Sequence, residues 1–296
     1  MDRNDVHSVR LHLDSHGWAV INMFSELEVR NFEQQFWNWA RQFPEELTKQ
    51  RFLKLLESEL PPRAHGILQH YNIGQSEFLW SIRTHPKMLE FYRTLYSRQD
   101  LIVSFDGANL SKPPKRTLQP WPHIDQGSRR LGFQCLQGYV TLVTGQNAGT
   151  VIYPRSHFYH SLLFEKFPEL KGPKDWVRLN SEHMNFLEAQ GIKQTLIQPR
   201  PGQLMIWDSR LVHYGSPPLT NYRLAAYVTY VPREWANQQN LEKRRKAFMA
   251  NRTTSHWPHK VRLVPRNPQT RGKAEILEKW PALPGALWTP EINQLI

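Results

Sequence analysis

The stretch Trp121-Pro-His-Ile-Asp-Gln-Gly-Ser-Arg-Arg-Leu-Gly-Phe-Gln-Cys-Leu-Gln137 organises the chain, and its centre is His123-Ile124-Asp125. A His and an Asp two positions apart on an extended segment point to the same side of a strand, so both side chains can reach one ion. His213, which follows the apolar run Gln203–Trp207, is the best third ligand. Two His and one carboxylate with open coordination positions are typical of non-haem Fe(II) sites.

A bare His-x-Asp is a weak signal, since about 0.3 occurrences are expected by chance in a chain of this composition. The alternative interpretation is a loop Asp beside a surface His. Arg223 adds context, because it opens a predicted strand over Asn221–Val231, ten residues after His213. A guanidinium there can bind a carboxylate through two parallel hydrogen bonds, although an isolated Arg at a strand start is usually exposed to solvent.

Several motifs in this order resemble the phytanoyl-CoA dioxygenase family of Fe(II)- and 2-oxoglutarate-dependent oxygenases. They are Trp121–Gln126, Cys135–Leu142, Gly149–His157, Pro201–Asp208, and His213 with Arg223. The resemblance covers roughly residues 10–235 and departs from the family at Arg155, which replaces a glycine, and along Ser161–Lys193. It implies cofactor chemistry and says little about the substrate.

The resemblance implies that Fe(II) is held by His123, Asp125 and His213, while Arg223 binds the far carboxylate of 2-oxoglutarate. Dioxygen is the oxidant, ascorbate is a further candidate cofactor, and succinate and CO2 are released as a small organic substrate is hydroxylated. Two alternatives stay open. One is the same chemistry on a nucleic acid or protein side chain docked through a basic surface, and the other is a catalytically silent jelly-roll binding module.

Further site candidates follow from strand periodicity and from the resemblance. Gln137 and Tyr139 share one face of the predicted strand Phe133–Val143, where Tyr139 would contact the cosubstrate and Gln137 the substrate; ordinary core residues are the alternative. Asn109, near the end of the predicted strand Leu101–Leu110, is a second cosubstrate candidate, with a turn residue as its alternative. Gln126, inside the central motif, is a candidate substrate contact.

Short strands separated by Gly and Pro turns predict a mainly β fold with flanking helices, namely a double-stranded β-helix of the jelly-roll, cupin-like type. One domain is expected over 1–296, with N-terminal helices in 1–100, the jelly-roll core in about 101–235 and a C-terminal extension in 236–296. Helices are expected over Val29–Phe43, Glu45–Leu60 and Leu241–Met249, and two strands joined by a turn over Thr195–Gln198 and Gln203–Trp207.

Composition limits the environment and the partners. The net charge of +12 permits an acidic partner such as nucleic acid, but no nucleic-acid-binding motif accompanies it, so a small-molecule substrate is favoured. Cys135 is the only cysteine, which excludes an intrachain disulfide. With a polar start over Met1–Asp14 and no long apolar run, we expect a soluble intracellular protein, cytoplasmic or nuclear. The sequence does not indicate an oligomeric state.

Overall fold

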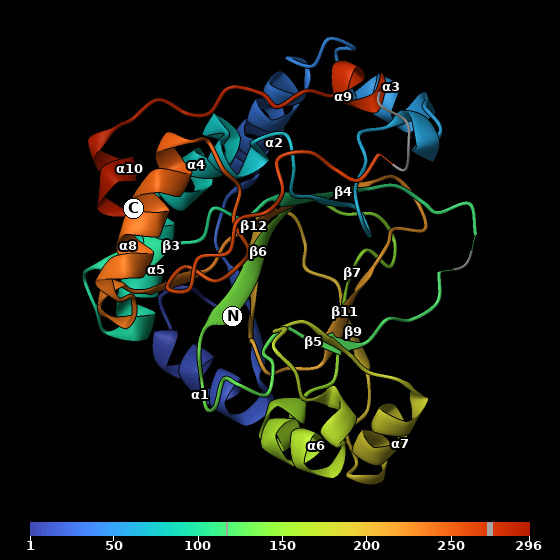
Figure 1. Cartoon of the computed structure of the whole chain (residues 1–296), viewed down its shortest axis with the longest axis vertical. Helices are drawn as coiled ribbons and strands as arrows, with labels where there is room; N and C mark the ends of the chain where they lie inside the picture. Colours follow the sequence, from blue (N-terminus) through green and yellow to red (C-terminus); the bar gives the residue numbers. More distant parts are fainter. Residues whose placement is uncertain (117, 271–274) are drawn as a thin grey trace.

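Two antiparallel sheets face each other in the computed structural model, which describes residues 1–116, 118–270 and 275–296 (Figure 1). The larger sheet has the order β1 (Trp18–Asn22), β10 (Gln203–Asp208), β6 (Leu136–Val143), β12 (Arg223–Tyr227), β4 (Ala108–Ser111) and β2 (Ile67–Leu68). The smaller sheet has the order β8 (Val177–Arg178), β5 (His123–Ile124), β11 (His213–Ser216), β7 (Gly149–Ile152) and β9 (Thr195–Ile197). A further pair joins β13 (Tyr230–Pro232) to β3 (Leu101–Val103). The predicted jelly-roll is thus confirmed.

Several strands are shorter than the sequence pattern predicts. The segment expected as one strand over Leu101–Leu110 breaks into β3 and β4, and the one over Asn221–Val231 breaks into β12 and β13. The two strands predicted over Thr195–Gln198 and Gln203–Trp207 are present as β9 and β10, but they do not pair with each other. β9 pairs with β7 and β10 pairs with β1 and β6, so the turn between them carries the chain from one sheet to the other.

Helices cover the outer sides of the sheets. They are α1 (Val6–His16), α2 (Glu26–Ala40), α3 (Lys49–Lys54), α4 (Glu77–Arg83), α5 (Pro86–Tyr96), α6 (His160–Lys166), α7 (Ser181–Ala189), α8 (Gln238–Met249), α9 (Glu275–Lys279) and α10 (Pro290–Gln294). The long helix predicted over Glu45–Leu60 is wrong, because Thr48 caps a six-residue helix and the chain turns extended at Leu55. No helix in the described ranges is long and apolar enough to cross a bilayer.

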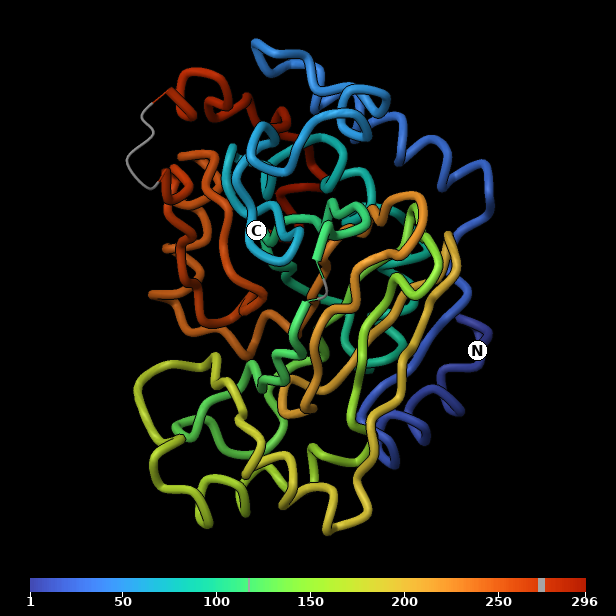
Figure 2. The backbone as a smooth tube through the Cα atoms, turned by 90° about the vertical axis from the view of Figure 1, so that its right-hand side faces the viewer, coloured from blue at the N-terminus to red at the C-terminus, as the bar shows by residue number. Residues whose placement is uncertain are grey.

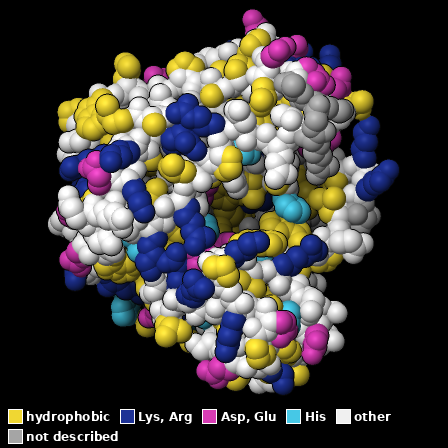
Figure 3. Space-filling view, viewed as in Figure 1, with side chains coloured by type: hydrophobic (Ala, Val, Ile, Leu, Met, Phe, Trp, Pro, Cys, Tyr) yellow, Lys and Arg dark blue, Asp and Glu magenta, His cyan; other side chains and the backbone are white. Residues whose placement is uncertain are grey.

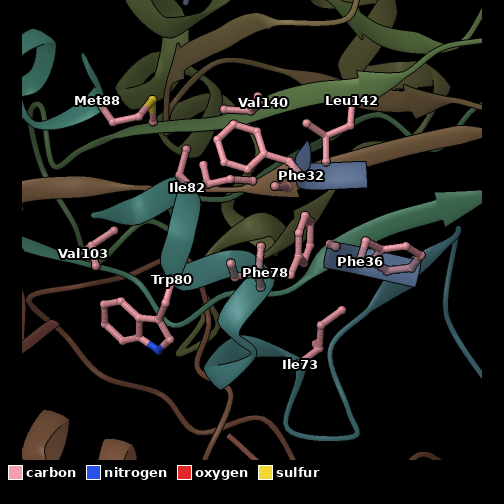
Figure 4. Packing of buried hydrophobic residues seen from close by; sticks show 14 of the residues in the cluster. Phe32, Phe36, Ile73, Phe78, Trp80, Ile82, Met88, Val103, Val140 and Leu142 are labelled. Carbon is pink, nitrogen blue, oxygen red and sulfur yellow. The ribbon is translucent and has the colours of Figure 1, made fainter. Parts of the chain in front are cut away.

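The main core lies between the larger sheet and helices α2, α4 and α5. Alternation along β6 sends Val140 and Leu142 outward, where they meet Phe32 of α2 and Ile82 of α4 (Figure 4). The same alternation turns the odd-numbered residues of β6 inward, among them Tyr139 in the smaller cluster between the sheets. The apolar helices therefore fix one face of β6, and its polar face is left for the space between the sheets.

The chain after residue 236 folds back across the N-terminal segment. The backbone N–H of Leu283 donates to the carbonyl of Tyr71 at 3.1 Å, and Asn72 donates to the carbonyl of Leu283 at 2.9 Å (Figure 2). In α8, Arg244 is 1% exposed and is therefore not part of a basic surface. The helix predicted over Leu241–Met249 thus has one of its cations in the interior.

Candidate metal centre and its cavity

Three of the predicted site residues converge on one point between the sheets. The antiparallel pairing of β5 with β11 places His123 directly opposite His213, and Asp125 follows β5. One ligand atom from each of the three residues lies within 4.8 Å of the others. Asp125 Oδ1 is 3.7 Å from His123 Nε2, and Oδ2 is 3.4 Å from His213 Nε2. Two imidazole nitrogens and a carboxylate around a common point fit a divalent transition metal.

Backbone carbonyls fix which nitrogen of each His is free. Nδ1 of His123 is 3.2 Å from the carbonyl oxygen of Trp121, and Nδ1 of His213 is 2.9 Å from that of Leu211. A carbonyl only accepts, so each Nδ1 carries the proton and donates. Each Nε2 is then left with its lone pair facing Asp125, which is the tautomer that a metal ligand needs.

The protonation states of the cluster suit a cation. Burial, together with the neighbouring His213, lowers the pKa of His123 to about 3, even though Asp125 acts in the opposite direction. Burial raises the pKa of Asp125, but the two His side chains outweigh it and hold that pKa well below its usual range. At neutral pH the site therefore presents a neutral imidazole at His123 beside an ionised carboxylate, the forms that bind metal.

Arg223 lies in the same cavity as the three predicted ligands. Its side chain is 4% exposed, and its guanidinium carbon lies 4.8 Å from the centre of the Tyr139 ring. Neither a hydrogen bond nor an ion pair joins this guanidinium to any residue that the structure describes. A buried cation without a partner is costly unless an anion joins it. Arg223 is thus placed to receive an anionic ligand.

The cavity has a volume of about 290 Å³ and opens on one face of the molecule, which is hollowed there and bordered by Lys and Arg side chains (Figure 3). Its walls come from all three predicted regions of the chain. His65 comes from the N-terminal region, the metal cluster and Arg223 from the core, and His256 from the C-terminal extension. The three regions build one site together.

Tyr139, Asn109 and Gln137 all line this cavity. The Tyr139 hydroxyl is 3.0 Å from Thr150 Oγ1. Asn109 donates from Nδ2 to the carbonyl of His65 at 3.1 Å and accepts from Ser111 Oγ at 2.9 Å, so its amide is largely occupied by the protein. Gln137 is 2% exposed, and neither end of its amide has a partner among the described residues.

The structure does not place Gln126 in the cavity. Its side chain is fully buried and donates to the carbonyls of Arg130 and Gly132, at 2.7 and 2.8 Å, while it accepts from Ser209 Oγ at 2.7 Å. β5 ends at Ile124, so strand alternation no longer governs where residue 126 points. The predicted substrate contact is wrong, and Gln126 instead holds the loop after Asp125.

Sequence reasoning missed several residues of the cavity wall. Trp121 stacks on the His123 ring at 4.6 Å between centroids, and His65 stacks on the other side of Trp121 at 4.1 Å. Trp176, from the segment before α7, lies 5.6 Å from His123. Trp121 could have been predicted as a cavity residue because it stands in the central motif. No local sequence pattern identifies His65 or Trp176 as cavity residues. His157 and His160 are not part of the cluster formed by His123, Asp125 and His213.

Comparisons with known proteins agree with this architecture. No protein-family model matches the chain. It is 26% identical over 215 residues to the Ava biosynthesis cluster protein O of Aspergillus versicolor, covering 68% of this chain and 69% of that protein. The epimerase SnoN, solved with Fe3+, alpha ketoglutarate and nogalamycin RO, superposes with a TM-score of 0.52 at 16% identity, covering 77% of this chain and 84% of SnoN.

A second solved structure, EctD of S. alaskensis with 2-oxoglutarate and 5-hydroxyectoine, has a TM-score of 0.50 at 15% identity, covering 76% of this chain and 75% of EctD. At these identities the likeness concerns the fold. The chain therefore shares its jelly-roll fold with SnoN and with EctD.

Proposed function

We propose that this protein is an Fe(II)- and 2-oxoglutarate-dependent dioxygenase that hydroxylates a small organic substrate and releases succinate and CO2. The observation that carries the proposal is the unpaired, buried Arg223 in the same cavity as His123, Asp125 and His213. Three metal-ligand side chains alone would fit many activities. The same three side chains with a separate buried cation fit a cosubstrate that chelates the metal at one end and carries a carboxylate at the other.

In this proposal His123 and His213 hold the ion through Nε2, and Asp125 holds it through its carboxylate. Bound there, Fe(II) supplies the activation of dioxygen and the oxidative decarboxylation of the cosubstrate. The protein contributes the positions of the ligands, which the carbonyls behind each imidazole keep fixed. The buried walls around them keep water and side reactions away from the reacting atoms.

Arg223 is proposed to bind the far carboxylate of 2-oxoglutarate, with the Tyr139 ring packed against its guanidinium. A Cβ added at Gly215 would lie 3.9 Å from Arg223 Nη1, so the glycine leaves room beside the guanidinium for that carboxylate. Asn109 supports the site in this scheme by holding the His65 carbonyl. SnoN and EctD, both crystallised with this cosubstrate, share the fold, which supports the choice.

Small substrates are favoured because the cavity of about 290 Å³ lies near the lower end of the range for small-molecule sites. The same chemistry on a nucleic acid is the alternative, and the Lys and Arg side chains beside the hollow are the observation in its favour (Figure 3). Salt-dependent binding of single-stranded DNA or RNA would support that alternative. All of residues 1–296 are proposed to act as one domain, because each region contributes to the cavity.

The test measures cosubstrate turnover and binding separately. Native protein with Fe(II) and 2-oxoglutarate is expected to release succinate, and Mn(II) with 2-oxoglutarate is expected to raise its melting temperature. Asp125→Asn should lose both effects, while Glu165→Gln, which removes an exposed carboxylate, should keep both. Succinate release undiminished in Asp125→Asn would refute the assignment of the metal ligands.

A further inference from the structure

Polar atoms without partners gather at one wall of the cavity. Gln137 Nε2 and Oε1, Ser255 Oγ and His256 Nε2 are all buried, and none has a hydrogen-bond partner among the described residues. Most buried polar groups in native proteins are hydrogen-bonded, and an unpaired one destabilises the folded state. The three residues that carry these four atoms all line one cavity, where a ligand can supply the missing partners.

The wall is held in place by residues on each side of it. Thr254 donates from its backbone N–H to the carbonyl of Phe105 at 2.9 Å, and its Oγ1 accepts from the Phe105 N–H at 3.1 Å. The Ser255 N–H donates to the carbonyl of Arg262 at 2.9 Å. These bonds occupy the backbone and leave the Ser255 and His256 side chains free to face the cavity.

This wall is distinct from the end that holds Arg223. Gln137 stands next to Thr229 across the β6–β12 pairing, because Tyr139 pairs with Tyr227 and the strands are antiparallel. Arg223 lies four residues before Tyr227 along β12, near Gly215. The cavity therefore has a cationic end at Arg223 and a separate wall around Gln137 that carries hydrogen-bonding groups, with the three metal-ligand candidates opening onto the same space.

The chemistry of the wall selects a class of substrate. A primary amide with both N–H and C=O free is complementary to a group that presents an acceptor and a donor side by side, which is an amide. Ser255 and His256 add one hydroxyl and one imidazole nitrogen. The indoles of Trp121 and Trp176 and the ring of Tyr227 also line the cavity, and such surfaces favour a flat group.

We propose that Gln137, Ser255 and His256 form a substrate-recognition wall for a compact molecule that carries a primary or cyclic amide. This inference rests on the proposed function only in calling the amide-bearing molecule the substrate, since recognition of the amide depends on the wall alone. The molecule is compact because about 290 Å³ must also admit the cosubstrate.

The test uses 2-piperidone as an amide probe and cyclohexanone as a matched ring without the N–H. Their binding to the full chain is measured by saturation-transfer NMR, without metal and again with Zn(II) and 2-oxoglutarate. Native protein should prefer 2-piperidone about tenfold, the effect of one or two net hydrogen bonds. Gln137→Met, an apolar residue of equal length, and Gln137→Glu, which lacks the amide donors, should both lose that preference.

Thermal denaturation supplies a second readout. Gln137→Met removes two unsatisfied buried atoms, so its melting temperature should equal or exceed that of native protein. A clear fall would mean that the amide has a structural role and would overturn the proposal, as would equal binding of both probes to native protein. Loss of the 2-oxoglutarate-dependent thermal shift in Gln137→Met would assign the amide to the cosubstrate and overturn it too.

These outcomes are separable from failure of the proposed function. If native protein shows no thermal shift with Mn(II) and 2-oxoglutarate yet prefers 2-piperidone, the dioxygenase assignment fails and the amide-binding wall stands. If the thermal shift is present and the probe preference is absent, the wall fails and the metal and cosubstrate assignment stands.

Discussion

Arg244 offers a sharp test of how the C-terminal extension is attached. Its guanidinium donates to the carbonyls of Ile296, Pro258, Val103 and Leu295, so one side chain joins α8 to the chain terminus and to β3. Arg244→Met would remove one hydrogen bond from each of four carbonyls, at about 1 kcal/mol each, although the Leu295 carbonyl would keep its bond from the Val103 N–H at 3.3 Å. Relief of the desolvation of the cation offsets part of this loss, which leaves a net destabilisation of about 3 kcal/mol.

The assay is calorimetric unfolding of the full chain. For a chain of this size, about 3 kcal/mol corresponds to a fall of about 6–12 °C in melting temperature. Arg245→Met is the matched control, because Arg245 is the next residue of α8 and is exposed, and it should stay within about 2 °C of native protein. Equal melting temperatures for the two variants would refute the claim that the hydrogen bonds of Arg244 hold the C-terminal extension against the rest of the domain.

Three further changes are expected to have separate effects. Gly215→Leu should abolish the thermal shift caused by 2-oxoglutarate and keep the shift caused by Mn(II), because the new side chain fills the space beside Arg223. Burial alone raises the pKa of Glu28, but Lys87 and the helix cap lower it to about 2. Glu28→Gln should therefore lower the free energy of unfolding at pH 7 by about 1–2 kcal/mol, after allowance for solvent screening. Near pH 2 it should have no effect, and urea titrations at the two pH values measure the difference. Asp175→Asn should speed hydrogen exchange over residues 172–178 by about tenfold or more, because it weakens two ion pairs.

The controls for these changes use neighbouring positions. Gly215→Ala should weaken 2-oxoglutarate binding less than Gly215→Leu does, since a Cβ there has ordinary contacts at 3.6 and 3.9 Å; undiminished binding in Gly215→Leu would mean that the space beside Arg223 is not a ligand site. Glu26→Gln, which removes an exposed carboxylate of α2, should not change the pH dependence of stability. A Glu28→Gln penalty that persists at pH 2 would contradict the ion-pair explanation, because a depressed carboxyl pKa stabilises only above that pKa. Unchanged exchange in Asp175→Asn would show that the ion pairs do not hold the segment.

The central motif could be predicted because local geometry decides it. His123 lies in β5 and Asp125 directly follows it, so the two side chains are close in the chain whatever the rest of the fold does, and Arg223 opens a strand that the apolar pattern marks clearly. Period two also predicted that Gln137 and Tyr139 face the same space. These are short-range statements about single strands, and strand pairing did not alter them.

The remaining wall could not be read from the sequence, because only tertiary packing brings it to the cavity. Ser255 and His256 lie in an irregular segment after α8. Hydrogen bonds from the preceding Thr254 to Phe105 and from the Ser255 N–H to Arg262 hold this segment in place. The prediction for Gln126 was wrong because a local pattern was extended too far. It stands in the motif itself, but β5 ends two residues earlier and the chain turns at Gly127, so the expected alternation stops before it.

Buried arginines show how the structure distinguishes framework from site. Arg244 donates to four carbonyls, Arg130 forms a bidentate ion pair with Asp175 at 2.6 and 2.9 Å, and each is thereby satisfied by the protein. Arg223 is as deeply buried as Arg244 to within a few per cent, yet it has no such partner in the described chain. Arg223 therefore lacks the protein acceptors that satisfy Arg244, and an anionic ligand in the cavity would supply them. The same reasoning applies to the neutral amide of Gln137, which is why the two ends of the cavity are assigned to two different molecules.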